Sequence, residues 1–441
     1  MSMMEKFFSV NYENRGDLFQ GLRIWESEKF RKLQGTYPVL FVSFADVKET
    51  TFEQARKKIC KIIQMIYNKY DFLQKSDVLN ENEKKDFWKV CPDMEDYMAV
   101  LSLKMLCDYL GRYYGKKVIV LLDEYDTPMQ EAYLNGYWEE MAAFIRSMFN
   151  STFKTNPNLE RAFMTGITRI SKESVFSDLN NLEVVTATFA KYAECFGFTE
   201  GEVFISLKEY GLSDQKQEVK DWYDGFIFGG KGDIYNPWSI LNFLDKGKAG
   251  AYWANSSSNS LAGKLVREGS RNLKESFEVL LQGGTICTEI DEQIVYSMLE
   301  QDEQAIFSLL LASGYLKVTG HKAYASDFGE WKEEYELQLT NFEVKAMFRQ
   351  MIRKWFGGSA YGYNDFIRAL LLNDVKAMNT YMNKVAVNTF SCFDTGKNPA
   401  LRQIEENDYQ ALLVAKGIPG ERIRKYGFAF CGKKVLISAG R

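Results

Sequence analysis

The sequence predicts an α/β fold in which helices surround a parallel sheet, and two observations indicate it. Apolar runs rich in Val, Leu, Ile and Phe occur at residues 37–46, 118–123 and 161–171, and such continuous runs are typical of parallel strands buried on both faces. Segments with apolar residues at helical spacing separate these runs. Strands that alternate with helices in this way form parallel sheets, whose ligands bind at the carboxyl ends of the strands.

Local signals define the elements of this sheet region. Thr50 or Thr51 is expected to cap one helix, and Gly115 to end the next. Asp46 closes the first strand. The expected order is a helix at 1–9, a strand at 37–46, helices at 51–70 and 93–115, a strand at 118–123, a helix at 136–154 and a strand at 161–171.

From about residue 200 the pattern changes to shorter elements. We expect a helical unit at 197–211, a Gly- and Trp-rich loop at 221–244, and a hairpin that turns near His321. The last forty residues predict a helix, a turn and two short strands. The predicted regions are an α/β domain at 1–200, a connecting motif-rich region at 201–270, a mostly helical lid or winged-helix-like module at 271–345, and a helical segment with a small α/β tail at 346–441.

Composition limits the class of protein. Hydrophobic residues make up 46% and charged residues 26% of the 441 residues, which is ordinary for globular domains. The net charge of −4 provides no overall basic surface for nucleic acid. No stretch approaches the roughly 18 uncharged residues of a membrane helix, and the 7 cysteines are scattered without CxxC spacing. We therefore expect a soluble cytoplasmic protein with reduced thiols and no membrane partner.

The strongest chemical signal is the acidic end of the strand VIVLLDEYDTP, residues 118–128. In phosphate-transfer sites an aspartate at the tip of a buried strand holds the magnesium shell, and a following glutamate orients the attacking water. Asp123 and Glu124 fit these roles, with Asp123 as the metal ligand. The alternative is a helix cap or a solvated strand edge. Asp126 is a further candidate for nucleotide binding, but with Thr127 and Pro128 it could instead cap the next helix or form an Asx-turn.

Other polar residues are expected at the same edge of the sheet. Asp46 closes one strand, and Thr165, Thr168 and Arg169 follow or end another. Hydroxyl and guanidinium groups there could contact the phosphates of a nucleotide and sense its γ-phosphate. An ordinary transition from strand to loop explains the same residues equally well.

Six motifs together carry a family resemblance: VIVLLDEYDTPM, MTGITRISKESVFSDLNNL, FGFTEGEV, WYDGFIFG, YNPWSILNFL and YWANSSSN. In this order they resemble a bacterial family with an AAA-ATPase-like domain followed by a PD-(D/E)XK nuclease-type domain. The resemblance implies an N-terminal P-loop NTPase-like domain that uses ATP and Mg, with Asp123 and Glu124 as the Walker B pair. The tail would then be a remnant of the nuclease-type domain.

The sequence departs from this family at the phosphate loop. No G-x-x-x-x-G-K-[ST] motif is present, although its backbone amides and lysine hold the phosphates in P-loop proteins. The family has this loop directly before a helix similar to MSMMEKFF, so the chain looks as if it starts just after the loop. Charge-assisted hydrogen bonds contribute roughly 1.5–3 kcal/mol each. Losing several of them would weaken a micromolar site to millimolar or worse.

The tail shows a second departure. A PD-(D/E)XK nuclease needs an Asp and an E-x-K on adjacent strands, and the resemblance predicts that these strands are missing between Lys397 and Asn398. The sequence Glu343-Val344-Lys345 follows Asn341, a good helix cap, and predicts the start of a helix. We therefore expect no nuclease activity.

Two functional hypotheses follow. In the first, the chain is an AAA-ATPase-like protein whose ATP binding and hydrolysis are impaired by the absent Walker A motif. In the second, it is a non-catalytic binding or scaffold protein, associated with nucleic acid or protein, with degenerate ATPase and nuclease domains. The sequence leaves open whether the chain forms a homo-oligomer.

Overall fold

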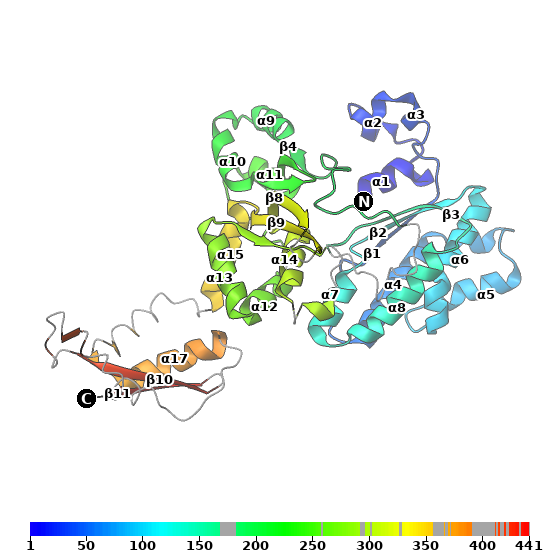
Figure 1. The fold of residues 1–441 in the computed structure, drawn as a ribbon. Coiled ribbons are helices and arrows are strands. Elements are labelled where there is room, and N and C mark those ends of the chain that lie inside the picture. Colours follow the sequence, from blue (N-terminus) through cyan, green and yellow to red (C-terminus); the bar gives the residue numbers. More distant parts are fainter. Residues whose placement is uncertain are drawn as a thin grey trace. The chain divides into compact units, whose positions relative to one another are not determined.

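Contacts divide the chain into two compact units. The first comprises Met1–Ala193, Phe228–Gly230 and Cys287–Glu336, and the second Glu194–Ile227, Lys231–Ile286 and Leu337–Arg441. The structure is a computed structural model, shown in Figure 1. It describes residues 1–167, 182–256, 259–291, 296–299, 302–325, 329–355, 372–389, 423–431 and 434–440, and the single positions 366, 369, 370, 411, 413, 414 and 419.

A three-stranded parallel sheet forms the centre of the first unit (Figure 1). Its order is β1 (Val39–Ser43), β2 (Val118–Asp123) and β3 (Leu159–Met164), and both pairings are parallel. The central strand β2 is buried on both faces from Val118 to Leu122, which explains its uninterrupted apolar sequence. The predicted α/β class with a parallel sheet is therefore confirmed.

Helices cover this sheet. Helix α1 (Ser2–Phe8) places Met4 and Phe8 against a cluster formed by Val39, Ile119 and Leu121. Helices α4 (Phe52–Lys69), α6 (Asp96–Tyr114) and α8 (Trp138–Phe153) pack against one another, and α4 and α6 also contact β1 and β2. The remaining helices of this region are α2 (Arg23–Glu26), α3 (Glu28–Arg31), α5 (Glu81–Lys89) and α7 (Thr127–Asn135).

The predicted helix ends are confirmed at two positions. Thr51 is the N-cap of α4, where its hydroxyl accepts a hydrogen bond from the Gln54 N–H at 3.4 Å. Gly115 ends α6 with φ of 62°, a left-handed conformation that glycine adopts without steric cost.

The region after residue 197 is more regular than the sequence predicted. It contains β4 (Phe198–Thr199), α9 (Glu200–Glu209), α10 (Lys216–Tyr223), β5 (Phe226–Phe228), β6 (Lys231–Tyr235) and α11 (Pro237–Lys246). The strands form a sheet of order β4-β6-β5. The expectation of a loop at 221–244 was wrong, because the buried side chains of Tyr223, Tyr235 and Phe243 belong to one apolar core. Asn236 caps α11 by accepting from the Trp238 N–H at 2.9 Å.

Another three-stranded sheet has the order β7-β9-β8. Its strands are β7 (Ile286–Thr288), β8 (Leu316–Ala325) and β9 (Trp331–Leu339), and helix α14 (Glu303–Ala312) packs against β8. Helices α12 (Ser260–Glu268) and α13 (Arg271–Gln282) precede β7 in the sequence and contact each other. His321 lies inside β8, so the predicted turn there was wrong. The glycine at position 320 leaves room for the Glu336 side chain on β9, because a Cβ at this position would lie 2.6 Å from Glu336 Oε2.

The last described elements are α15 (Phe342–Trp355), α17 (Val375–Thr389), β10 (Lys425–Cys431) and β11 (Lys434–Gly440). The strands β10 and β11 form an antiparallel hairpin, which confirms the two strands predicted at the tail. Asn379 and Asn383 on α17 bind the backbone of Ile437 and Val435, so this helix covers the edge of β11. The break predicted at Lys397 lies outside the described residues. In the part of the chain that the structure describes, no helix has the length and apolar character needed to cross a membrane.

Candidate functional site

The carboxyl ends of the three parallel strands bring several polar residues together. Asp123 is the last residue of β2 and lies in register with Ser43, the last residue of β1. Thr165 directly follows β3, and its hydroxyl donates a hydrogen bond to Asp123 Oδ1 at 2.6 Å. The backbone fixes this pair, because the Thr165 N–H donates to the carbonyl of Leu122 at 2.9 Å. A half-buried carboxylate and two hydroxyls therefore share one end of the sheet.

Glu124 lies at the turn that leads from β2 into α7. Its φ is 50°, a left-handed conformation that is uncommon for residues other than glycine, and strained residues of this kind cluster at functional sites. Its side chain is exposed, and Oε2 accepts a hydrogen bond from the Thr127 hydroxyl at 3.0 Å. Among the described residues, neither Asp123 nor Glu124 forms a salt bridge with Lys or Arg.

Asp126 has a different environment. It is 1% exposed, and Oδ2 accepts hydrogen bonds from the Ile167 N–H at 2.9 Å and from Gln130 Nε2 at 3.2 Å. Asp126 occupies the N-cap position of α7, but its side chain does not cap that helix. A Cβ on Gly166 would lie 2.6 Å from Asp126 Oδ1, so glycine at this position lets the Asp126 carboxylate pack closely against the backbone.

The remaining predicted site residues divide into two groups. Asp46 lies in the turn after β1, where its side chain is exposed and forms no hydrogen bond with another described residue. Thr168 and Arg169 lie outside the described residues, and Ile167 is the last residue before them that the structure describes. The structure thus joins Asp123 to Thr165, and Asp126 to the segment after Thr165.

Sequence analysis did not identify three residues of this site: Ser43, Gln130 and Gly166. Ser43 ends a predicted strand, so its position at the same sheet edge as Asp123 could have been recognised from strand order. A glycine two residues after a strand is a weaker signal for close packing against the backbone.

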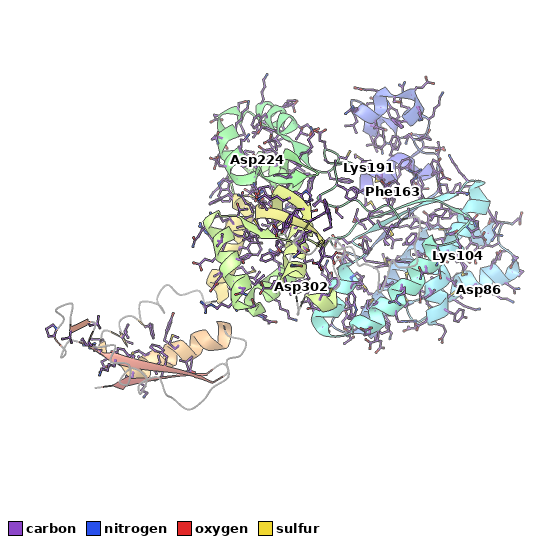
Figure 2. The ribbon with its side chains drawn as sticks, viewed as in Figure 1. Asp86, Lys104, Phe163, Lys191, Asp224 and Asp302 are labelled. Atoms are coloured by element: carbon purple, nitrogen blue, oxygen red, sulfur yellow. The ribbon has the colours of Figure 1, made fainter. Side chains whose placement is uncertain are left out.

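Two other features of the structure do not contribute to this site. An open hollow of about 570 Å³ lies along α2 and α3, and its lining consists of Arg23, Ile24, Glu26, Ser27 and Phe30. In the second unit, carboxylate oxygens of Glu200, Asp224 and Asp233 lie within 4.8 Å of one another (Asp224 is labelled in Figure 2). Lys220 Nζ lies 2.5 Å from Glu200 Oε2, and this hydrogen bond lowers the pKa of Glu200. The lysine therefore already neutralises part of this acidic cluster.

Comparisons with known proteins support the family resemblance in the N-terminal part of the chain. The chain is 24% identical over 239 residues to the "Uncharacterized protein in vnfD 5'region" of Azotobacter chroococcum mcd 1. This match covers 54% of the chain but 43% of that protein, so the chain spans less than half of its relative's length. No solved structure matches the chain. Residues 1–176, which include β1, β2, β3 and every candidate site residue, match the family described as "Predicted AAA-ATPase".

Proposed function

We propose that the chain binds a magnesium nucleotide, of the ATP type, at the carboxyl ends of β1, β2 and β3. The observation that carries this proposal is the hydrogen bond between Asp123 and Thr165 at the end of adjacent parallel strands. Ligands of open parallel sheets bind at this edge. The match of residues 1–176 to the "Predicted AAA-ATPase" family supports the same conclusion.

The roles of the residues follow from their chemistry. Asp123 offers a carboxylate oxygen, and Ser43 and Thr165 offer hydroxyls, which are the hard oxygen ligands and water-shell partners that Mg favours. Glu124 is exposed beside them and would orient the attacking water. Asp126 is buried and holds the backbone of Ile167, so we assign it a positioning role rather than a direct contact with nucleotide.

The carboxylate and hydroxyl oxygens at this edge suit the binding of magnesium better than the binding of the phosphates. The sequence contains no G-x-x-x-x-G-K-[ST] loop, and neither Asp123 nor Glu124 has a described lysine or arginine as an ion-pair partner. We therefore propose weak binding, in the millimolar range that the loss of several charge-assisted hydrogen bonds implies.

Thermal unfolding of the full chain with and without Mg-ATP tests the proposal. Ligand at about ten times its Kd should stabilise the folded state by about 1.4 kcal/mol, which raises Tm by about 3–6 °C for a domain of roughly 150–250 residues. Asp123→Asn should abolish this shift while leaving the Tm without ligand nearly unchanged, because asparagine keeps the oxygen that accepts from Thr165. Glu124→Gln is the matched control and should keep the shift. A wild-type chain that does not respond to Mg-ATP would contradict the proposal.

A second candidate is a non-catalytic binding or scaffold protein, which the absent phosphate loop favours. Protein is a better partner for it than nucleic acid. The element order from α13 to β9 and the sheet order β7-β9-β8 resemble a winged helix, in which the helix before the hairpin enters the DNA groove. Here that helix is α14, and its residues 305–311 are all buried. The strands β8 and β9 together carry three lysines and three glutamates, and Lys322 pairs with Glu336, so the hairpin offers no net positive charge to phosphates.

A further inference from the structure

Strands β8 and β9 are neighbours in their sheet (Figure 1), and one face of this pair carries three aromatic rings and a carboxylate. Trp331, Glu333 and Tyr335 are spaced two residues apart on β9, so they lie on the same face of the strand. The His321 ring of β8 packs against the Tyr335 ring, with 4.6 Å between the ring centroids. These four side chains therefore form one surface, which we call the aromatic face.

Glu333 lies at the centre of the aromatic face. Its Oε1 accepts a hydrogen bond from the Trp331 indole N–H at 3.2 Å, and its Oε2 accepts one from the Tyr335 hydroxyl at 3.3 Å. His321 Nε2 lies 3.7 Å from the same Oε2 and forms an ion pair with it only when the imidazole is protonated. Among the described residues, no lysine or arginine forms a salt bridge with Glu333. The neighbours therefore orient the carboxylate but provide no permanent positive charge beside it.

The opposite face of the same two strands is balanced in charge. Lys322 Nζ lies 3.1 Å from Glu336 Oε1, and the Tyr324 hydroxyl donates a hydrogen bond to Glu334 Oε1 at 2.9 Å. The charged side chains of this face are two lysines, Lys322 and Lys332, and two glutamates, so their charges cancel. Such cross-strand pairs satisfy a sheet face from within. The carboxylate without a permanent cation is thus confined to the aromatic face.

The aromatic face is open to solvent. Trp331 is 68% exposed, and the side chains of His321 and Glu333 are 43% and 48% exposed. Tryptophan is highly buried on average, and Trp and Tyr are enriched among the residues that contribute most to protein–protein binding. An open face suits a polypeptide partner, because small ligands bind in concave sites that bury most of their surface.

We propose that the aromatic face binds an arginine side chain of a partner protein. A guanidinium group is planar, so it stacks on the Trp331 ring while its N–H groups donate to the Glu333 carboxylate. Charge-assisted hydrogen bonds of this kind are roughly twice as strong as neutral ones. Lysine fits less well, because its ammonium group is a point charge with no plane that can stack. This interaction does not depend on the proposed nucleotide binding.

Charge complementarity favours a basic segment of another protein over the alternatives. Nucleic acids and anionic membranes present phosphates, which the Glu333 carboxylate repels. A second copy of this chain carries the same net charge of −4, so the two copies repel each other at long range. A basic segment has the opposite charge, and complementary charge raises both the rate of encounter and the specificity of binding.

The experiment uses the full chain and a fluorescein-labelled probe peptide, Gly-Thr-Arg-Thr-Gly, that also carries a benzophenone photocrosslinker. Anisotropy should show saturable binding, and the cross-links should map to β8 or β9. Glu333→Gln removes the charge but keeps the size of the side chain, and it should weaken binding about tenfold or more, the effect of one charge-assisted hydrogen bond. Trp331→Leu removes the ring and should weaken binding about two- to fivefold.

Glu334→Gln is the matched control, because it removes the same charge from the same strand on the opposite face. This variant should bind the peptide like the wild-type chain. A peptide with citrulline in place of arginine keeps the planar group without its charge and should not bind, and a peptide with lysine should bind more weakly.

Equal affinity of the wild-type chain and Glu333→Gln would refute the proposal. An equal loss in Glu333→Gln and Glu334→Gln would also refute it, because the attraction would then come from the overall charge of the chain. Equal affinity for the lysine peptide would overturn the assignment of arginine, and cross-links confined to other elements would overturn the assignment of the site. Self-association of the chain that Glu333→Gln abolishes would show that the occupant is a second copy, which would likewise contradict the proposal.

Discussion

Replacing Glu343 by alanine should lower the free energy of unfolding of the second unit by about 3 kcal/mol or more, since each buried polar group left without a partner costs about 1–3 kcal/mol. Glu343 is completely buried at the start of α15. Its carboxylate accepts hydrogen bonds from the Ser239 hydroxyl at 2.8 Å and from the Ala254 N–H at 3.2 Å. These partners lie 104 and 89 residues away in sequence, so the carboxylate joins three separate segments of one core.

Urea unfolding followed by tryptophan fluorescence measures this loss, and hydrogen exchange at the Ala254 amide localises it. Glu275→Ala is the matched control, because the Glu275 side chain is 58% exposed and pairs with Arg271 on the surface. The control should change stability by less than about 0.5 kcal/mol. An Ala254 amide that exchanges equally slowly in Glu343→Ala and in the wild-type chain would show that the carboxylate does not hold this loop.

The same residue should give the second unit a pH-dependent stability. Burial raises the pKa of Glu343 above its ordinary value of 4.5, although hydrogen bonds from Ser239 and from the N–H groups of Ala254, Trp253 and Tyr252 act in the opposite direction. A raised folded-state pKa means that this contribution is fully present below pH 4.5 and is lost as pH rises through the folded-state value. Tyr223 and Tyr252 also face the carboxylate, and burial raises the pKa of each phenol, so they remain neutral throughout this range.

Glu343→Gln removes the titrating group but keeps the shape of the side chain. As pH rises above 4.5, the unfolding free energy of the wild type should therefore fall relative to that of Glu343→Gln. A difference that stays constant would mean that folding does not shift the pKa of Glu343, and a wild type that gains stability relative to the variant as pH rises would mean that folding lowers this pKa.

Local sequence signals predicted the sheet and its helices correctly. The apolar run of β2 identifies a strand buried on both faces, and Thr51 and Gly115 mark helix ends because caps depend on only a few neighbouring residues. The same apolar run places Asp123 at the end of a strand, because Asp123 directly follows the run and its position depends on no distant contact. The start of α15 at Phe342 was predicted for the same reason, and Asn341 accepts from the Val344 N–H at 3.0 Å.

Contacts between distant residues account for what the sequence did not predict. Gly320 looks like a turn residue until β9 is known, because only the approach of Glu336 explains a glycine within a strand. Asp126 reads as a helix cap from its neighbours Thr127 and Pro128, yet its partner is the backbone of Ile167, 41 residues later. A pattern within one segment cannot reveal which other segment will pack against it.

Gly166→Ala should destabilise the first unit by about 1–3 kcal/mol, the usual cost of adding a methyl group to a well-packed site. The new Cβ would lie 2.6 Å from Asp126 Oδ1 and 2.8 Å from Tyr125 Cε1, and both side chains are buried. Asp126→Ala should cost about as much or more, because it removes the acceptor of the Ile167 N–H. Thermal and urea unfolding of the two variants measure these changes.

The double variant separates steric conflict from general damage. Asp126→Ala removes the atom nearest to the alanine methyl at position 166, Asp126 Oδ1, so Gly166→Ala should cost less in the Asp126→Ala background than in the wild type. Gly201→Ala on α9 is the matched glycine control, since nothing lies within 4 Å of its added Cβ. Strictly additive losses would mean that the two residues do not contact in solution. Asp126 would then not position the segment after Thr165, and the end of the sheet would depend on the Asp123–Thr165 pair alone.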